Sequence, residues 1–200
     1  MQQYLDVIRR VLESGHRKSN RTGVDTLSTF NVNYQIDLRL GFPLLTTKEI
    51  SWKNIVVENL WFLSGDTRID LLRKHGCRFW EPWADENGLV PSAYGNFWRN
   101  FPVHKDGEAA FNDQIRYVVD ELKARPQSRR LVVSAWAPGN AQTSALPPCH
   151  AFWVLNVQQD EHGEPLLCLH LTQRSCDVAL GLPYNIAGYA FLLELISRFT

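Results

Sequence analysis

The chain has 200 residues, enough for one ordinary domain with a sizeable core. Apolar residues make up 44% of it, and 21 basic residues balance 21 acidic ones. This balance argues against a nucleic-acid-binding or membrane-surface protein, so any anion site must be local. No apolar run reaches the roughly 18 residues that span a membrane, and the amphipathic start does not resemble a signal peptide.

The first third of the chain mixes helical and strand-like patterns. Residues 1–15 place apolar side chains on one helical face, and residues 20–23 form a turn with a positive charge. Residues 26–38 alternate apolar and polar side chains, which predicts a strand. Helices are predicted over 52–63 and 69–74, because a glycine follows each helical pattern.

The rest of the chain adds a helix, three strands and a last helix. Helical spacing starts at Phe111 and Pro126 ends it. Runs rich in β-branched and aromatic residues predict strands over 131–136, 152–157 and 166–172. An apolar helix follows over 189–199. Without repeats or linkers, the pattern predicts one α+β domain over residues 1–200, a mixed β-sheet packed with helices.

The last helix bears on whether the sequence is complete. An apolar helix is costly to expose when nothing follows to cover it. We therefore expect either that the chain is C-terminally incomplete or that a partner covers this face.

The cysteines indicate reduced thiols rather than disulfides or a metal site. They form no C-x-x-C pair and have no histidine at metal-ligand spacing: Cys77, Cys149, Cys168 and Cys176. We expect a cytoplasmic protein without a metal. Cys149 follows two prolines at the start of a predicted strand. It is a candidate nucleophile if nearby cations stabilise a thiolate, and otherwise a buried core cysteine.

Arginines beside hydroxyl groups form a second candidate site. Ser128 precedes Arg129 and Arg130, and Arg174 precedes Ser175. Guanidinium groups bind phosphate dianions through paired, charge-assisted hydrogen bonds. Arg21, on the early turn, is a further candidate cation. The alternative is that these arginines are solvated surface residues.

Two further polar residues, one ahead of the last predicted helix and one on an earlier predicted helix, are candidates for a functional role. Asn185 offers an amide donor and acceptor that match a uracil edge, but it also suits a helix N-cap. Glu58 lies on a predicted buried helix face, where burial would raise its carboxyl pKa. The alternative for Glu58 is a structural ion pair.

Trp80, Trp83 and Tyr94 lie close together in the sequence, beside the acidic loop 85–88. Aromatic side chains of this kind can stack on a flat heterocycle. The alternative is that they pack in the core.

Taken together, these segments resemble the folate-dependent thymidylate synthase family. The resemblance covers essentially the whole chain, with the motifs in the family's order. They are NRTG at 20–23, GFPLLTTK at 41–48, LWFLSGDT at 60–67, WADENG at 83–88, SRR at 128–130, VSAW at 133–136, PCHAF at 148–152 and QRSCDVALGLPYN at 173–185, together with Glu58 and Tyr94-Gly95.

The resemblance implies an enzyme that methylates deoxyuridine monophosphate (dUMP). The implied catalytic residues are Cys149, which adds to the uracil ring, and Glu58, Tyr94 and Asn185. The implied dUMP-binding residues are Arg21, Arg129, Arg130, Gln173, Arg174, Ser175, Asp177 and Asn185. The co-substrate 5,10-methylenetetrahydrofolate supplies carbon and hydride, and the residues implied for it are Lys48, Trp80, Trp83 and Asp177.

The resemblance further implies a homodimer with the sheet at its interface. Arg129 and Arg130 would then reach the partner's site. Phe97 departs from the family, which usually has a glutamine there, and the family continues beyond the last helix with a segment that closes over the folate. Two alternatives stay open: a pyrimidine nucleotide hydroxymethylase of the same family, and a truncated form that binds nucleotide without turnover.

Overall fold

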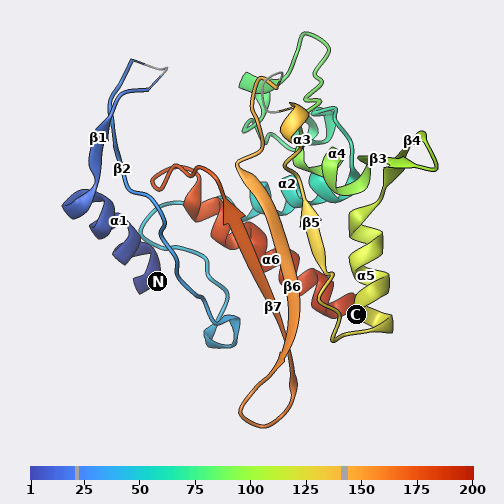
Figure 1. Ribbon diagram of the computed structural model, residues 1–200. Helices are drawn as coiled ribbons and strands as arrows, with labels where there is room; N and C mark the ends of the chain where they lie inside the picture. The colour runs from blue at the N-terminus through green and yellow to red at the C-terminus, as the bar shows by residue number, and fades with distance from the viewer. Residues whose placement is uncertain (21–22, 141–143) are drawn as a thin grey trace. The chain divides into compact units, whose positions relative to one another are not determined.

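The computed structural model describes residues 1–20, 23–140 and 144–200 (Figure 1). The chain divides into two compact units. The first contains Met1–Ile50 and Asp177–Ala190, and the second contains Ser51–Cys176 and Phe191–Thr200. Helices and small antiparallel sheets alternate along the chain, which confirms the predicted α+β class. Across the described residues, no helix combines the length and hydropathy needed to cross a membrane.

The first unit begins with helix α1 (Gln2–Ser14), as predicted. Two short antiparallel strands follow, β1 (His16–Lys18) and β2 (Thr26–Ser28), with Arg17 opposite Leu27. A single 3₁₀ turn, η1, covers Leu38–Leu40. The unit also contains the start of the last helix, α6 (Leu182–Phe199), which begins seven residues before the predicted start at 189.

The predicted strand over 26–38 is wrong beyond Ser28. Asn31 adopts a φ of 59°, in the left-handed region, which is incompatible with extended backbone. Phe30 is 94% exposed, so the alternating pattern does not mark a buried sheet face. Residues 29–37 form no helix or strand.

The second unit contains two helices where the sequence predicted them, α2 (Trp52–Ser64) and α3 (Asp70–Lys74). The Ser51 hydroxyl caps α2 by accepting the Asn54 N–H, and Gly65 ends the helix with a φ of 73°. A short helix, α4 (Tyr94–Arg99), was not predicted. The second unit also contains the 3₁₀ turns η2 (Glu81–Trp83) and η3 (Pro138–Asn140).

The helix predicted from Phe111 begins three residues later, as α5 (Gln114–Ala124). Asp113 is the reason, because its carboxylate accepts the Arg116 N–H and caps the helix. Phe111 belongs instead to a hairpin of β3 (Phe101–Lys105) and β4 (Glu108–Asn112), where it lies opposite Pro102.

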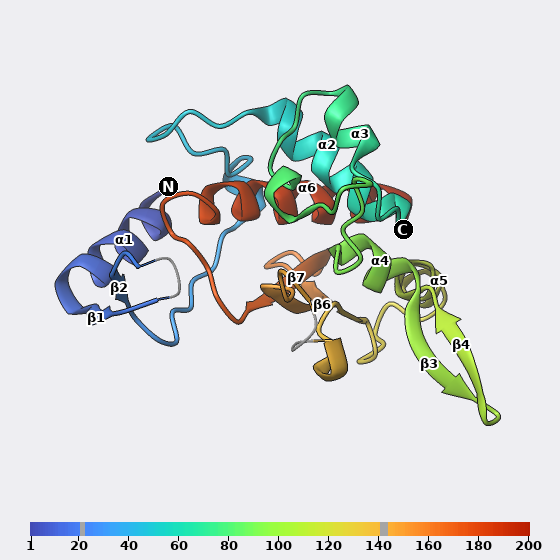
Figure 2. The ribbon, with the colours of Figure 1, turned by 90° about the horizontal axis from the view of Figure 1, so that it is seen from above.

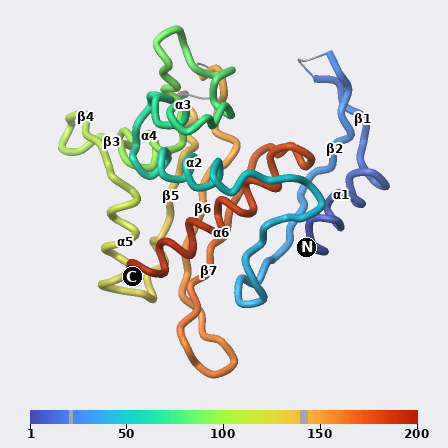
Figure 3. The backbone as a smooth tube through the Cα atoms, turned by 180° about the vertical axis from the view of Figure 1, so that it is seen from behind, coloured from blue at the N-terminus to red at the C-terminus, as the bar shows by residue number. Residues whose placement is uncertain are grey.

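A three-stranded antiparallel sheet organises the second unit. Its order is β5 (Val132–Ser134), β6 (His150–Gln159) and β7 (Pro165–Gln173). The end of α6, from Phe191 to Phe199, lies over one face of this sheet (Figures 2 and 3). The pairing of β6 with β7 is irregular between His150 and Phe152, so the strand is bulged beside Cys149.

The buried part of the second unit is strongly aromatic. Trp61, Trp98 and Trp153 are each at most 1% exposed. They belong to a cluster in which the centroids of contacting rings lie 5.2–5.8 Å apart: Trp61, Phe62, Trp80, Tyr94, Trp98 and Trp153. Edge-to-face packing is the favourable geometry for such rings. The buried rings therefore pack α2, α4 and β6 against one another.

Candidate active site

The centre of the candidate site is Cys149, at the start of β6. Its thiol is half-buried, rather than enclosed in the core as the alternative interpretation required. The Arg174 Nη2 lies 3.6 Å from the Cys149 Sγ. A guanidinium at this distance stabilises negative charge on sulfur, which is the condition for a cysteine nucleophile.

Arg174 is held beside Cys149 by the ends of two paired strands. The Arg174 N–H donates to the Cys149 carbonyl at 2.9 Å, which continues the pairing of β6 with β7. Its Nε donates to the Pro148 carbonyl at 2.9 Å and its Nη2 to the Pro147 carbonyl at 2.6 Å. The guanidinium carbon also lies 5.5 Å from the ring centre of Trp136. The guanidinium is thus fixed on several sides.

Tyr94 reaches Cys149 from α4. Its hydroxyl oxygen accepts the Cys149 N–H at 3.2 Å, and its ring stacks on His150 with centroids 4.6 Å apart. Burial, followed by the Cys149 thiol, raises the pKa of Tyr94 well above its ordinary value. Tyr94 is therefore a neutral phenol near neutral pH, able to donate its proton in a hydrogen bond.

Glu58 is linked to the same region by Trp80. The Trp80 Nε1–H donates to the Glu58 carboxylate at 2.7 Å, and the Trp80 and Tyr94 ring centroids lie 5.4 Å apart. Burial raises the pKa of Glu58 to about 7, against the opposing effect of the Trp80 hydrogen bond. The rise agrees with the prediction from the sequence, and the partner is an indole rather than the cation of an ion pair.

Gly95 explains how Tyr94 is brought to this position. A Cβ at Gly95 would lie 2.3 Å from the Phe62 carbonyl oxygen, closer than two such atoms can approach. The absence of a side chain lets α4 pack directly against α2. Tyr94 and Glu58, one on each helix, are thereby held close to Trp80.

Several other residues that the family resemblance assigns to the site also belong to the second unit. Gln173 ends β7 opposite His150, and Ser175 follows Arg174 on the exposed surface. Trp83 lies in η2 and is partly exposed, whereas Trp80 is 5% exposed and packs in the aromatic cluster.

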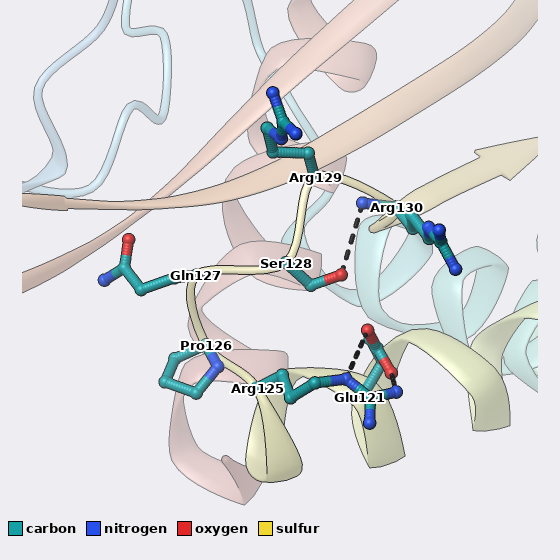
Figure 4. A pocket seen from close by; sticks show the side chains of 7 residues that line it. All are labelled: Glu121, Arg125, Pro126, Gln127, Ser128, Arg129 and Arg130. Carbon is teal, nitrogen blue, oxygen red and sulfur yellow. Dashed lines mark hydrogen bonds and ion pairs between the residues drawn. The ribbon is translucent and has the colours of Figure 1, made fainter.

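Arg129 and Arg130 lie on the turn between α5 and β5. They line a hollow of about 560 Å³ with Glu121, Arg125, Pro126, Gln127 and Ser128 (Figure 4). The lining of this hollow does not include Cys149. The two arginines therefore form a second positively charged site on this unit, in addition to Arg174 beside Cys149.

The remaining expected residues belong to the first unit. The Lys48 Nζ donates to the Ala179 carbonyl at 2.8 Å. The Asp177 carboxylate accepts the N–H groups of Ala179 and Leu180 at 2.9 and 2.8 Å. Asn185 lies inside the first turn of α6 and its N–H donates to the Gly181 carbonyl, so its interpretation as an N-cap is wrong. Arg21 lies outside the described residues.

Sequence reasoning missed two contributors to the site. The Phe62–Gly95 contact could have been suspected from a glycine placed next to Tyr94, but only if α4 had been predicted. Trp136 is the last residue of a predicted strand, and nothing in its sequence neighbourhood pointed to Arg174. In the parts of the chain that the structure describes, no group of three His, Cys, Asp or Glu side chains is arranged to hold a metal ion.

Fold and site together define an α+β protein with a thiol and a guanidinium held side by side at the ends of paired strands. Residues 2–200 match the thymidylate synthase family, and the chain belongs to this family. It is also 46% identical over 212 residues to a thymidylate synthase of Haloferax volcanii. That match covers 96% of this chain and 60% of the relative, so the chain spans less than two thirds of the relative's length.

Proposed function

We propose that the protein is a thymidylate synthase that converts dUMP to dTMP, with 5,10-methylenetetrahydrofolate as the donor of both carbon and hydride. Membership of the family supports this proposal. The observation that carries it is the 3.6 Å contact between the Arg174 guanidinium and the Cys149 sulfur. From the cysteine pattern of the sequence, which indicates reduced thiols, we further propose that the protein works in the cytoplasm.

In the proposed reaction, Cys149 acts as a nucleophile toward the uracil ring. Its thiolate forms a bond to C6 of the pyrimidine, and the electron pair of the C5–C6 double bond moves toward C5 and the neighbouring carbonyl oxygen. C5 thereby becomes nucleophilic. C5 then bonds to the one-carbon unit as that unit's bond to the folate nitrogen breaks. The thiolate is regenerated when the proton at C5 has been removed and the S–C6 bond has broken again, and hydride from the folate, which becomes dihydrofolate, completes the methyl group. Arg174 favours the anionic sulfur and, with Ser175, is assigned to the substrate phosphate.

Glu58 and Tyr94 are proposed to handle the protons. A carboxyl group with a pKa of about 7 is divided between its acid and base forms near neutral pH, so it can both accept and return a proton. Tyr94 stays protonated and contacts the backbone of Cys149, so it can orient a water molecule toward C5. His150, whose ring stacks on that of Tyr94, is assigned a supporting role.

The residues assigned to the folate have side chains that fit its chemistry. The folate supplies a one-carbon unit and a hydride. A carboxylate such as Asp177 accepts hydrogen bonds from ring N–H groups, and an ammonium such as Lys48 pairs with the carboxylates of the tail. The indoles of Trp80 and Trp83 suit a flat ring. The same family pattern assigns the uracil edge to Asn185, whose amide matches uracil rather than cytosine.

We also propose a homodimer formed through the open face of the three-stranded sheet. Val132 and Phe152 are 41% and 38% exposed, and the register places Val132 opposite the half-buried Val154. Since Phe152 and Val154 are two residues apart on one strand, these apolar side chains share a face. An apolar sheet face of this kind is typical of an interface. In the dimer, Arg129 and Arg130 are assigned to the partner's phosphate site.

The proposed reaction is tested by following the hydrogen at C5. The protein is incubated with dUMP tritiated at C5 and with methylenetetrahydrofolate, and both the released tritium and the mass of the product are measured. We expect tritium release and dTMP, and no release from a Cys149→Ser variant. Nucleotide binding without tritium release would contradict the proposal, and a hydroxymethyl product would assign the protein to the hydroxymethylases.

The proposed dimer is tested by mixing inactive variants. Arg130→Ala and Cys149→Ala proteins are each expected to be nearly inactive. After exchange of subunits, a mixed dimer contains one site with both residues intact, so part of the activity should return. Mixtures without any recovery, from protein that sediments as a monomer, would show that each site is built from a single chain.

A further inference from the structure

The hollow beside the α5–β5 turn contains a buried carboxylate that the proposed reaction does not use. The Glu121 side chain is 6% exposed, while that of Arg125, its partner, is 70% exposed. The Arg125 Nε donates to the Glu121 carboxylate at 3.0 Å, and its Nη2 donates to the second carboxylate oxygen. Such a forked pair fixes the orientation of a carboxylate.

Glu121 is also connected to the segment that carries Arg129 and Arg130. The Ser128 side chain lies beside the Glu121 carboxylate in the lining of the hollow, and its hydroxyl oxygen accepts the Arg130 N–H at 3.3 Å. The Ser128 N–H donates to the Arg125 carbonyl at 2.9 Å, which closes the turn. Figure 4 shows these residues around the hollow, with the Arg129 side chain directed away from Glu121.

The two ends of this segment are therefore held in different ways. After Arg130, the chain is fixed by the sheet, because the Leu155 N–H donates to the Leu131 carbonyl at 2.8 Å. Before Arg129, the backbone is held by Ser128, whose N–H donates to the carbonyl of Arg125, the residue that Glu121 pairs with, and whose hydroxyl oxygen accepts the Arg130 N–H. Without the carboxylate, the turn would lose its buried anchor while three guanidinium groups remained close together.

The charges around the hollow favour the ionised form of Glu121. Hydrogen bonds from Arg125 and then from Ser128 hold its carboxyl pKa below the ordinary value, and the charge of Arg130 adds to the effect. A glutamine in this place keeps the size of the side chain but removes the charge that balances the arginines.

We infer that Glu121 is a positioning residue for phosphate binding: through Ser128 and Arg125 it sets the backbone from which Arg129 and Arg130 extend. The inference rests on the proposed function, in which these two arginines hold the dUMP phosphate. A misplaced guanidinium weakens binding of the dianion, whereas a substrate already bound is turned over as before. The effect should therefore be on KM rather than on kcat.

The test compares Glu121→Gln with Asp120→Asn, which removes the same charge from the neighbouring, exposed position on α5. We expect the KM for dUMP to rise about tenfold in Glu121→Gln, with kcat within about twofold of the wild type, and no change in Asp120→Asn. Ser128→Ala removes the hydroxyl oxygen that accepts the Arg130 N–H without touching the Glu121–Arg125 pair, and it should also raise KM.

Two further readouts separate positioning from a general loss of structure. Exchange of the Arg130 amide hydrogen should accelerate in Glu121→Gln while amides of β6 are unchanged. In an Arg130→Ala background, Glu121→Gln should add little to the Kd for dUMP measured by calorimetry. If the wild type turns over dUMP and Glu121→Gln has the KM of Asp120→Asn, the inference is wrong and the proposed function stands. If the wild type does not turn over dUMP, both fall.

Discussion

Replacing Glu58 with glutamine is expected to remove a pH-dependent cost of folding. Burial raises the pKa of this carboxyl from 4.5 to about 7. The folded protein therefore prefers the protonated form, which the unfolded chain gives up at lower pH. Glutamine resembles the protonated carboxyl at every pH and retains an oxygen that can accept the Trp80 N–H.

The sign and size of the effect follow from linkage. Between pH 4.5 and about 7 the folded state binds more protons than the unfolded state, so the free energy of unfolding falls as the pH rises. Below pH 4.5 both states are protonated and the cost disappears. Above pH 7 the cost is complete, and a difference of this size in pKa corresponds to about 3 kcal/mol.

Urea denaturation of both proteins at several pH values between about 4 and 8.5 tests this reasoning. The glutamine variant should equal the wild type at the acid end and exceed its stability by about 3 kcal/mol at the alkaline end. Glu86→Gln, at an exposed position, is the matched control and should leave the wild-type curve unchanged. A stability difference that stays constant across the whole pH range would refute the raised pKa of Glu58.

Three other substitutions probe the site. Cys149→Ala should abolish tritium release while dUMP binding, measured by calorimetry, is largely retained; normal turnover would exclude the proposed nucleophile. Arg174→Ala should weaken dUMP binding by about 1.5–3 kcal/mol, the value of a hydrogen bond to a charged group, and unchanged affinity would move the phosphate site elsewhere. Gly95→Ala should cost about 1–3 kcal/mol of stability, since its methyl group would meet the Phe62 carbonyl oxygen at 2.3 Å. A melting temperature equal to that of the wild type would show that α4 can shift without cost.

Local signals in the sequence predicted the elements whose ends are marked by capping residues or by glycine. Helix α2 is an example, because Gly65 stops it with a left-handed φ. The failures occurred where tertiary context decided the conformation. Residues 26–38 alternate apolar and polar side chains, but the pairing with β1 ends at Ser28. Phe111 pairs in the β3–β4 hairpin and does not belong to α5.

The candidate site was only partly accessible to sequence reasoning. Cys149 and Arg174 were recognised as candidates from their motifs, and their contact depends on the pairing of β6 with β7. The connection of Glu58 to Tyr94 through Trp80 was not accessible, because it requires α2 and α4 to approach through Gly95. Long-range packing of this kind leaves no periodic trace in a single sequence.

The contact between the sulfur of Cys149 and the guanidinium of Arg174 joins groups 25 positions apart in the chain. In an unfolded chain the two groups are rarely neighbours, so the thiol gains its electrostatic support only when the two strand ends have met. The rate at which an alkylating reagent modifies this cysteine therefore reports whether β6 and β7 have paired. A newly made chain would acquire its reactive sulfur at the same moment as its native strand register.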